Sequence, residues 1–309
     1  MNAPTRTKIA LAFAAVYLIW GSTYLAIRAC VATMPPFLMA GTRFLIAGAV
    51  LYLAGRAAGA ARPTRDHLKS AALVGPLMVV LGNGLVVWSE RRLPSSTAAL
   101  LIAMAPVWFA VLAWIARGER PTAQRLAGIA TGLSGIFLLA GHGATDASGV
   151  PDPLGTAALL IASLSWAGGS LAARALPMPA HPLVSTGLQL MAGGALALPV
   201  GFALGEHRGF ALASVSAASW AAYAYLIVFG TLIGFTAYSW LNRVVSASSL
   251  STYAYVNPLV ALLLGATLGG EPLSARTLVS AAVILCGVAL MSAPPLRLPA
   301  LRWRLASSL

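Results

Sequence analysis

Acidic residues are scarce in this chain, and charge of either sign is rare. The 309 residues include 7 Asp and Glu against 20 Lys and Arg, so that the formal net charge is +13. Charged residues make up 9% of the sequence and hydrophobic residues 59%, with a mean hydropathy of +0.84. This composition argues against a soluble globular protein and indicates a chain embedded in a membrane.

Residues that carry chemistry are missing from the interior of the apolar segments. The acidic residues and the 4 histidines all lie in loops or near segment ends, at Asp66, Glu90, Glu119, Asp146, Asp152, Glu206, Glu271, His67, His142, His181 and His207. No motif of a hydrolase, a metalloprotease or an ATPase occurs, so the sequence indicates neither an enzyme nor ATP-driven transport. The 2 cysteines lie in unrelated contexts and indicate neither a disulfide nor a metal site. We therefore expect no cofactor.

Long apolar runs dominate the chain, and each can cross a bilayer, since a helical span needs about 20 residues. The runs are Ile9–Ile27, Pro36–Gly55, Ser70–Ser89, Leu93–Ala116, Leu126–Gly141, Pro153–Ala173, Pro182–Gly205, Gly209–Asn242, Val244–Gly270 and Thr277–Leu296. We predict an all-α polytopic membrane protein with ten transmembrane helices. The long run Gly209–Asn242 is expected to begin as a loop.

The sequence contains an internal repeat. Leu18, Trp20, Arg28, Pro36, Gly82, Trp88, Pro106, Glu119 and Gly135 recur as Leu164, Trp166, Arg174, Pro182, Gly234, Trp240, Pro258, Glu271 and Gly287. We assign 9–141 to a first five-helix repeat, 142–153 to an outer linker, 154–292 to a second repeat and 293–309 to a basic cytoplasmic tail. Because five is an odd number, the two repeats are inverted. Inverted repeats are typical of secondary transporters, whose substrate site lies between them.

Basic residues predict the orientation of the chain. If the N-terminus is cytoplasmic, most of the 20 Lys and Arg fall in the inner loops and tails, as the positive-inside rule requires. We therefore expect both termini to be cytoplasmic. The same bias explains the net charge without a nucleic-acid partner.

Three polar residues lie within or at the end of the second and third apolar runs. Arg43 either snorkels or is held by a carbonyl or by Glu90, or it binds a substrate carboxylate. Asn83 either packs between helices or lines a cavity. Glu90, beside Arg91 and Arg92, forms either a solvated salt bridge at the rim or a gate or proton site.

Aromatic residues near the centres of the spans are candidates for a cavity wall. Trp20 lies near the centre of the first run, with Tyr24 one turn further on, and its repeat equivalent Trp166 is central as well. Aromatic rings near span ends belong to interfacial belts, but these two tryptophans lie too deep for that role. We expect them to line a cavity rather than only to pack.

Two prolines mark matching places in the fourth and ninth spans. Pro106 and Pro258 each lack an N–H and free the carbonyl four residues earlier. A helix interruption that recurs in both halves is a sequence indicator of a transporter site, although a kink used only for packing is the alternative. Tyr253, Tyr255 and Asn257 immediately precede Pro258, so we place substrate there first.

Several motifs together resemble a known family. They are Ile19-Trp20-Gly21-Ser22-Thr23-Tyr24, Gly41-Thr42-Arg43-Phe44, Gly82-Asn83-Gly84 and Tyr253-Ala254-Tyr255-Val256-Asn257-Pro258. With the two five-helix copies, they resemble the EamA branch of the drug/metabolite transporter superfamily from Ile9 to about Ser292. The resemblance implies a ten-helix inner-membrane carrier, commonly an exporter of amino acids, other metabolites or drugs. The chain lacks the mid-membrane glutamate of the four-helix multidrug relatives, so their proton-exchange chemistry is not implied here.

We expect an inner-membrane secondary transporter that exports small amphipathic metabolites by alternating access between the repeats. The substrate would contact Trp20, Tyr24, Arg43, Asn83, Trp166, Tyr253, Tyr255 and Asn257. The alternative is a flippase or exporter of lipids or of quaternary or amphipathic cations, because aromatic walls can bind a cation. The expected partners are a small-molecule substrate and the lipid bilayer, with no nucleic acid. A fused duplicate needs no second chain, so a monomer is expected, with a homodimer left open.

Overall fold

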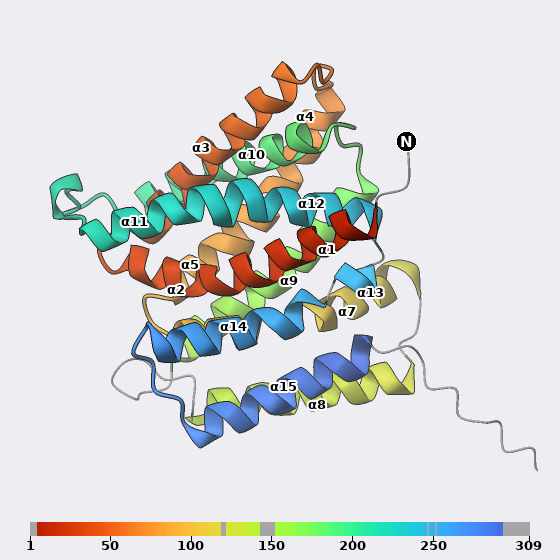
Figure 1. Ribbon diagram of the computed structural model, residues 1–309, viewed down its shortest axis with the longest axis vertical. Helices are drawn as coiled ribbons and strands as arrows, with labels where there is room; N and C mark the ends of the chain where they lie inside the picture. Colours follow the sequence, from red (N-terminus) through yellow and green to blue (C-terminus); the bar gives the residue numbers. More distant parts are fainter. Residues whose placement is uncertain (1–4, 119–121, 143–151, 246, 251, 293–309) are drawn as a thin grey trace, which may run out of the picture.

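The computed structural model describes residues 5–118, 122–142, 152–245, 247–250 and 252–292. Within these ranges all regular secondary structure is helical, which confirms the predicted all-α class. The helices stack in layers, with α3 (Pro36–Ala57) and α10 (Pro182–Ala203) at one end of the stack and α8 (Ala123–His142) and α15 (Ala275–Ser292) at the other (Figure 1). The basic tail and most of the outer linker lie outside the described residues.

The first repeat forms five spans, of which the second is α3 and the fifth is α8. The first span consists of α1 (Arg6–Ala14), η1 (Ala15–Ile19) and α2 (Trp20–Val31). The third consists of α4 (Arg65–Gly75), η2 (Pro76–Gly84) and α5 (Leu85–Ser89), and the fourth of α6 (Ser95–Ile102) and α7 (Ala105–Arg117). The segments η1 and η2 are π-helical, so the hydrogen-bond pattern changes within the first and third spans.

The second repeat has the same order of spans. It consists of α9 (Pro153–Ala175), α10, the short η3 (Leu212–Ser214), α11 (Ala217–Tyr225), the π-helical η4 (Leu226–Ile233), α12 (Gly234–Val244), α13 (Ala247–Leu250), α14 (Tyr253–Thr267) and α15. The predicted loop at the start of the run Gly209–Asn242 is present, because the eighth span begins only at Ala217.

In the part of the chain that the structure describes, ten apolar helical segments occupy the places of the ten predicted spans. Seven are long and apolar enough to cross a membrane, and three shorter apolar segments, in α8, α14 and α15, occupy the places of the fifth, ninth and tenth spans. Many of the large apolar side chains on these helices are exposed at the surface of the molecule, which a lipid environment would cover.

Local sequence explains where several spans begin. Proline occupies the first turn of α3, α9 and α10, where its missing N–H is not needed by the helix. At the start of α9, the side chain of Asp152 accepts a hydrogen bond of 2.9 Å from the backbone nitrogen of Gly155. At the start of α11, Ser216 accepts one of 3.1 Å from the backbone nitrogen of Ser219. Both residues are good N-caps.

Glycines bring the two repeats together at both ends of the stack. A Cβ on Gly48 of α3 would lie 2.9 Å from the carbonyl oxygen of Gly187 of α10. A Cβ on Gly287 of α15 would lie 2.5 Å from the backbone nitrogen of Gly132 of α8. Small residues allow this close helix packing, which is typical of membrane proteins. The repeats therefore meet through paired helices, α3 with α10 and α8 with α15.

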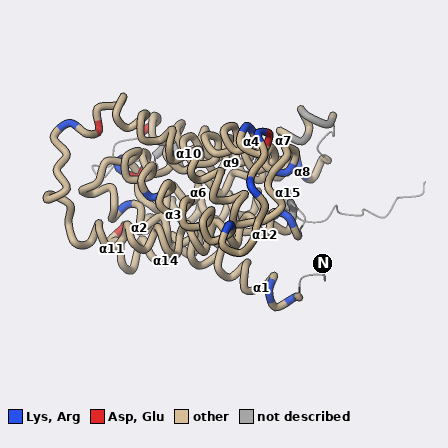
Figure 2. The backbone as a smooth tube through the Cα atoms, turned by 90° about the horizontal axis from the view of Figure 1, so that it is seen from above, with Lys and Arg blue, Asp and Glu red and all other residues tan. Residues whose placement is uncertain are grey.

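Charged residues lie mostly near the two ends of the helices (Figure 2). Glu206, in the connection between α10 and α11, accepts hydrogen bonds from the backbone nitrogens of Phe37 (2.9 Å) and Leu38 (3.0 Å) at the start of α3. A helix N-terminus carries partial positive charge, so a carboxylate stabilises it. Glu206 thereby joins the second repeat to the first.

Glu271 makes a similar connection at the start of α6. It accepts hydrogen bonds from the backbone nitrogens of Ser95 (2.8 Å) and Ser96 (3.1 Å), and it forms an ion pair with Arg28 at the end of α2. Burial alone would raise the pKa of Glu271, but the hydrogen bonds from Ser95 and Ser96 outweigh burial and hold its pKa below the usual value. At this end of the molecule, carboxylates of the second repeat thus bind the starts of two helices of the first repeat.

Candidate functional site

A cavity lies between the two repeats. It is lined by Trp20, Thr23, Tyr24, Ile27, Arg43, Gly82, Asn83, Val86, Ile102, Ala162, Trp166, Phe235, Tyr253 and Asn257. Its volume is about 70 Å³, which accommodates a few water molecules, whereas sites for drug-sized ligands hold roughly 300–1,000 Å³. The cavity is therefore too small to hold a ligand of that size in this conformation.

The structure brings together seven of the eight residues that were predicted to contact a substrate. Trp20, Tyr24, Arg43, Asn83, Trp166, Tyr253 and Asn257 all line this cavity. The eighth, Tyr255, belongs to α14, but its side chain lies outside the part of the chain that the structure describes. Contact of these residues with a substrate stays a prediction.

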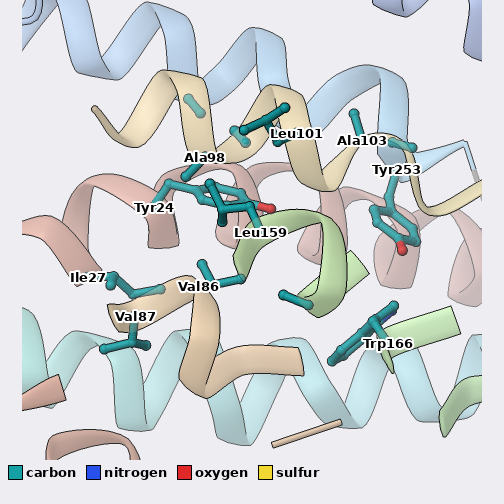
Figure 3. Close-up of a cluster of buried hydrophobic side chains, with 14 of the residues drawn as sticks. Tyr24, Ile27, Val86, Val87, Ala98, Leu101, Ala103, Leu159, Trp166 and Tyr253 are labelled. Atoms are coloured by element: carbon teal, nitrogen blue, oxygen red, sulfur yellow. The ribbon is translucent and has the colours of Figure 1, made fainter. Parts of the chain in front are cut away.

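Aromatic rings form one wall of the cavity. Trp20 of α2 and Trp166 of α9 meet edge to face with ring centroids 5.4 Å apart, and Phe235 of α12 contacts both. Tyr238 and Tyr253 complete the cluster, with ring centroids 4.9 Å and 5.9 Å from Trp20. In Figure 3 the ring of Tyr253 points from α14 toward Trp166. The two equivalent tryptophans therefore line the cavity and pack against each other.

Each tryptophan lies against a glycine of the other repeat. A Cβ on Gly234 of α12 would lie 2.4 Å from Nε1 of Trp20, and a Cβ on Gly82 of η2 would lie 3.4 Å from Cε3 of Trp166. The two contacts correspond to each other, because Trp20 and Gly82 in the first repeat are equivalent to Trp166 and Gly234 in the second. The absence of a side chain at Gly234 leaves the room that the Trp20 indole occupies, whereas a Cβ at Gly82 would only be in van der Waals contact with Trp166.

Arg43 is a buried cation on the cavity wall. Its side chain extends from α3, is 2% exposed, and donates from Nε to Oγ1 of Thr231 over 2.8 Å. The guanidinium carbon lies 4.6 Å from the ring centroid of Phe44. Nη1 has no hydrogen-bond partner among the described residues. Snorkelling to the membrane surface is thus ruled out, and the ion pairs of the described residues do not join Arg43 to Glu90.

The π-helical segment η4 positions both Arg43 and Trp20. Thr231 donates its hydroxyl to the carbonyl oxygen of Leu226, five residues earlier, over 2.9 Å, and this orients the hydroxyl oxygen toward Arg43 Nε. Trp20 donates from Nε1 to the carbonyl oxygen of Gly230 over 3.1 Å. π-Helical turns are frequent at functional sites. The equivalent segment of the first repeat, η2, contributes Asn83 to the same cavity.

Asn257 supplies a hydrogen-bond acceptor to the cavity, whereas Arg43 supplies a cationic donor. The residue lies on α14, is 4% exposed, and its Oδ1 has no partner within the described part of the chain. A buried donor or acceptor without a partner is costly unless water or a ligand satisfies it. The cavity thus offers an unpaired cationic donor and an unpaired acceptor between aromatic walls, and no carboxylate is among its described lining residues.

The two predicted helix interruptions differ. Pro106 stands in the first turn of α7, after a break from α6, and the carbonyl oxygen of Ile102 accepts a hydrogen bond of 3.3 Å from Ser163 Oγ. Pro258 instead lies inside the continuous helix α14, and the interruption of that span falls before Tyr253. Pro258 is the sixth residue of α14, so its missing N–H removes one backbone hydrogen bond, the one to the carbonyl oxygen of Ala254, without ending the helix. The predicted break is present at Pro106 and absent at Pro258.

Glu90 follows α5 and is 3% exposed, and neither carboxylate oxygen has a hydrogen-bond partner in the described residues. The expectation of a solvated salt bridge at the rim is therefore wrong. The neighbouring Arg92 pairs with Asp152 over 3.4 Å and stacks on Trp88. Burial without a partner disfavours the charged form of a carboxyl group. A role of Glu90 as a gate or proton site stays a prediction.

Sequence reasoning missed Phe235 on the cavity wall, Tyr238 in the aromatic cluster and Thr231, which accepts the hydrogen bond from Arg43. Phe235 and Tyr238 lie three residues apart on α12, directly after Gly234, and this aromatic spacing on one helix face was a signal that could have revealed them. Thr231 offered no such signal, because its contact with Arg43 depends on the π-helical turn. Among the described residues, no group of three or more His, Cys, Asp or Glu side chains could hold a metal ion.

Comparison with known proteins gives consistent matches along the chain. The sequence matches the EamA-like transporter family over residues 7–141 and again over residues 153–293. It is 38% identical to the uncharacterized inner membrane transporter YedA of Escherichia coli (strain K12), over 90% of this chain and 88% of that protein. It is 29% identical to a probable terminal-alkyne amino-acid exporter of Streptantibioticus cattleyicolor, over 93% of this chain and 94% of that protein. A solved crystal structure has the same fold, with a TM-score of 0.64 and 23% identity over 93% of this chain and 96% of that one.

Proposed function

Because the chain belongs to the EamA-like transporter family and is a membrane transporter, we propose that it exports small amphipathic metabolites, foremost apolar amino acids and related compounds. The observation that carries this proposal is the pair of unsatisfied groups, Arg43 Nη1 and Asn257 Oδ1, on one aromatic-walled cavity. A zwitterionic amino acid presents a carboxylate to the arginine and an ammonium donor to the asparagine. Its apolar side chain would lie against Trp20 and Trp166.

The charge of the cavity disfavours the alternative substrates. A quaternary amine or cationic lipid could stack on the aromatic rings. However, Arg43 would repel it, and the described lining of the cavity holds no carboxylate to offset that repulsion. The relative from Streptantibioticus cattleyicolor is a probable exporter of an amino acid, which agrees in chemical class with the substrate proposed here.

Transport would proceed by alternating access. A substrate needs more room than about 70 Å³, so the two repeats must separate at one side to admit it and at the other to release it. We place the protein in the inner membrane, as for its relative YedA, with both termini cytoplasmic. The end that Glu206 and Glu271 tie together would then face outward.

Counterflow in proteoliposomes tests the proposal. Vesicles loaded with unlabelled apolar amino acids are expected to accumulate a labelled one transiently and saturably. Arg43→Gln and Asn257→Ala are each expected to lower the initial rate about tenfold or more, since a hydrogen bond to a charged group contributes roughly 1.5–3 kcal/mol. Phe137→Ala, on the exposed face of α8, is the matched control and should transport like the unchanged protein.

Two results would count against the proposal. Unchanged counterflow in Arg43→Gln would remove the carboxylate-binding role of this residue. If folded protein accumulates no amino acid but does accumulate a labelled quaternary amine, the site serves cations instead.

A further inference from the structure

A second hollow opens on the other side of the aromatic cluster. It is much larger than the central cavity, at about 470 Å³, and lies between the end of α9, the start of α10 and the end of α12. Its lining includes Arg174, Arg243, Gln189, Asn242, Ser239 and Tyr238. We call this hollow the vestibule. In the orientation proposed above, its opening faces the cytoplasm.

Tyr238 separates the vestibule from the central cavity. Its side chain is 1% exposed and lines the vestibule, while its ring contacts Trp20 and Trp166 with centroids 4.9 Å and 5.2 Å away. Its hydroxyl shares a hydrogen bond of 2.9 Å with Oγ of Ser170 on α9. A molecule that passes from the vestibule to the cavity must therefore displace this ring.

Two arginines give the vestibule its charge. Arg174 is held through Nε by Oδ1 of Asn242 over 2.7 Å, which orients its guanidinium. Arg243 donates to the carbonyl oxygens of Ala180 (2.8 Å) and Pro179 (3.1 Å) and so fixes the connection between α9 and α10. No carboxylate is among the described residues that line the vestibule. An anion would therefore be attracted to it without a competing acidic side chain in that lining.

The internal repeat supplies a second argument for Arg174. Its equivalent in the first repeat is Arg28, which binds the carboxylate of Glu271 at the opposite end of the molecule. Arg174 occupies the corresponding place at the end of α9, but it faces an open hollow. The same helix position therefore presents a guanidinium to a carboxylate in one repeat and to a ligand-sized space in the other.

We propose that the vestibule is a second binding site, where Arg174 takes the carboxylate of a substrate before Tyr238 admits that substrate to the central cavity. The substrate class rests on the proposed function, but binding in the vestibule is measured without transport. Gln189 and Ser185, joined by a hydrogen bond of 3.2 Å, supply polar groups beside the bound molecule. The phosphate of an anionic lipid offers similar oxygens, so the test must separate the two sources.

A cysteine reporter in the vestibule makes binding visible. Ser239→Cys is introduced together with Cys286→Ser, which removes the exposed native thiol, whereas Cys30 is buried. The purified protein in neutral detergent is then labelled with methanethiosulfonate reagents that carry either a sulfonate or a trimethylammonium group. We expect the sulfonate reagent to react several-fold faster, and millimolar N-acetyl-leucine to slow the labelling at least threefold. The neutral N-acetyl-leucinamide, which lacks only the carboxylate, should not slow it.

Arg174→Gln is expected to abolish both the preference for the sulfonate reagent and the protection by N-acetyl-leucine. Arg125→Gln is the control, because Arg125 is exposed at the start of α8 and is not part of the vestibule lining. Val245→Cys, which also lines the vestibule, serves as a second reporter if Ser239→Cys fails to fold.

Several outcomes would overturn the proposal. The first is that N-acetyl-leucine and N-acetyl-leucinamide slow the labelling equally. The second is that N-acetyl-leucine still slows the labelling in Arg174→Gln. The third is that phosphatidylglycerol slows the labelling and N-acetyl-leucine does not. Failure of the two proposals is distinguishable. Protection without any amino-acid counterflow would support the vestibule and contradict amino-acid export, whereas counterflow without protection would contradict the vestibule alone.

Discussion

At the level of single residues, the cavity depends on positions without a side chain as much as on its aromatic rings. Trp20 and Trp166 occupy equivalent positions in the two repeats, and each contacts a glycine of the other repeat. The distance between the ring and that glycine differs, however. The space at Gly234 is already filled by the Trp20 indole, at 2.4 Å from an added Cβ, whereas Gly82 leaves 3.4 Å to Trp166. The repeat symmetry is therefore approximate at the site.

This difference makes Gly234→Ala more damaging than Gly82→Ala. The added methyl group should displace the Trp20 ring and break its hydrogen bond to the Gly230 carbonyl. Overpacking of this kind costs roughly 1–3 kcal/mol. We expect Gly234→Ala to lower the thermal unfolding midpoint in detergent and to slow counterflow clearly, with Gly82→Ala affected less. If the two variants have the same unfolding midpoint and the same counterflow rate, the Trp20 ring can move aside without loss of stability, which would contradict this prediction.

At the level of elements, the helix ends carry the connections between the repeats. Glu271, in the connection between α14 and α15, caps α6 and forms an ion pair with Arg28 of α2. This one side chain therefore joins that connection to two spans of the first repeat. The carboxylate must be charged to do this. The stability of the fold should therefore depend on pH through this residue.

The sign of that dependence follows from the lowered pKa of Glu271. A depressed folded-state pKa stabilises the fold above the ordinary value of 4.5 and loses this contribution as pH falls below it. We expect Glu271→Gln to reduce stability by about 1–3 kcal/mol at neutral pH and to lose less stability than the unchanged protein on acidification from pH 6 toward pH 3 (roughly the range spanned by carboxyl titration). Thermal unfolding in detergent measures both.

Asp66→Asn is a suitable control for that experiment, since Asp66 belongs to an exposed ion pair with Lys69. It should change stability by less than about 1 kcal/mol. If the stability of Glu271→Gln falls with pH in parallel with that of the unchanged protein, the charged Glu271 carboxylate does not stabilise the fold through the cap of α6.

For the whole molecule, the sequence was sufficient to predict the spans and to select the residues that meet at the cavity. Bilayer length predicts the helices, and the repeat relates Trp20 to Trp166 although they lie far apart in the chain. The burial of Glu90 and the hydrogen bond from Arg43 to Thr231 could not be predicted, because they depend on how distant spans pack. The continuity of α14 through Pro258 depends on where that helix begins, which the apolar run alone does not define.

The orientation of the whole molecule gives a further prediction. The excess of basic residues in one set of loops should keep both termini in the cytoplasm. A green fluorescent protein fused after Leu309 is therefore expected to fluoresce, and alkaline phosphatase fused after His207, between α10 and α11, to be active. The opposite pattern, with active phosphatase at the C-terminus, would invert the orientation and place the vestibule on the outer side.

The reciprocal contacts between each tryptophan and the glycine of the other repeat have a consequence for how this chain can change over generations. After a duplication, two copies are commonly free to diverge, but here Trp20 meets Gly234, and Trp166 meets Gly82. A larger residue at Gly234 is tolerable only if the facing Trp20 ring becomes smaller, whereas a Cβ at Gly82 would be in ordinary van der Waals contact with Trp166. Residues 20 and 234 are therefore expected to change together, and a related chain that had lost this tryptophan would be expected to carry a larger residue in place of the glycine.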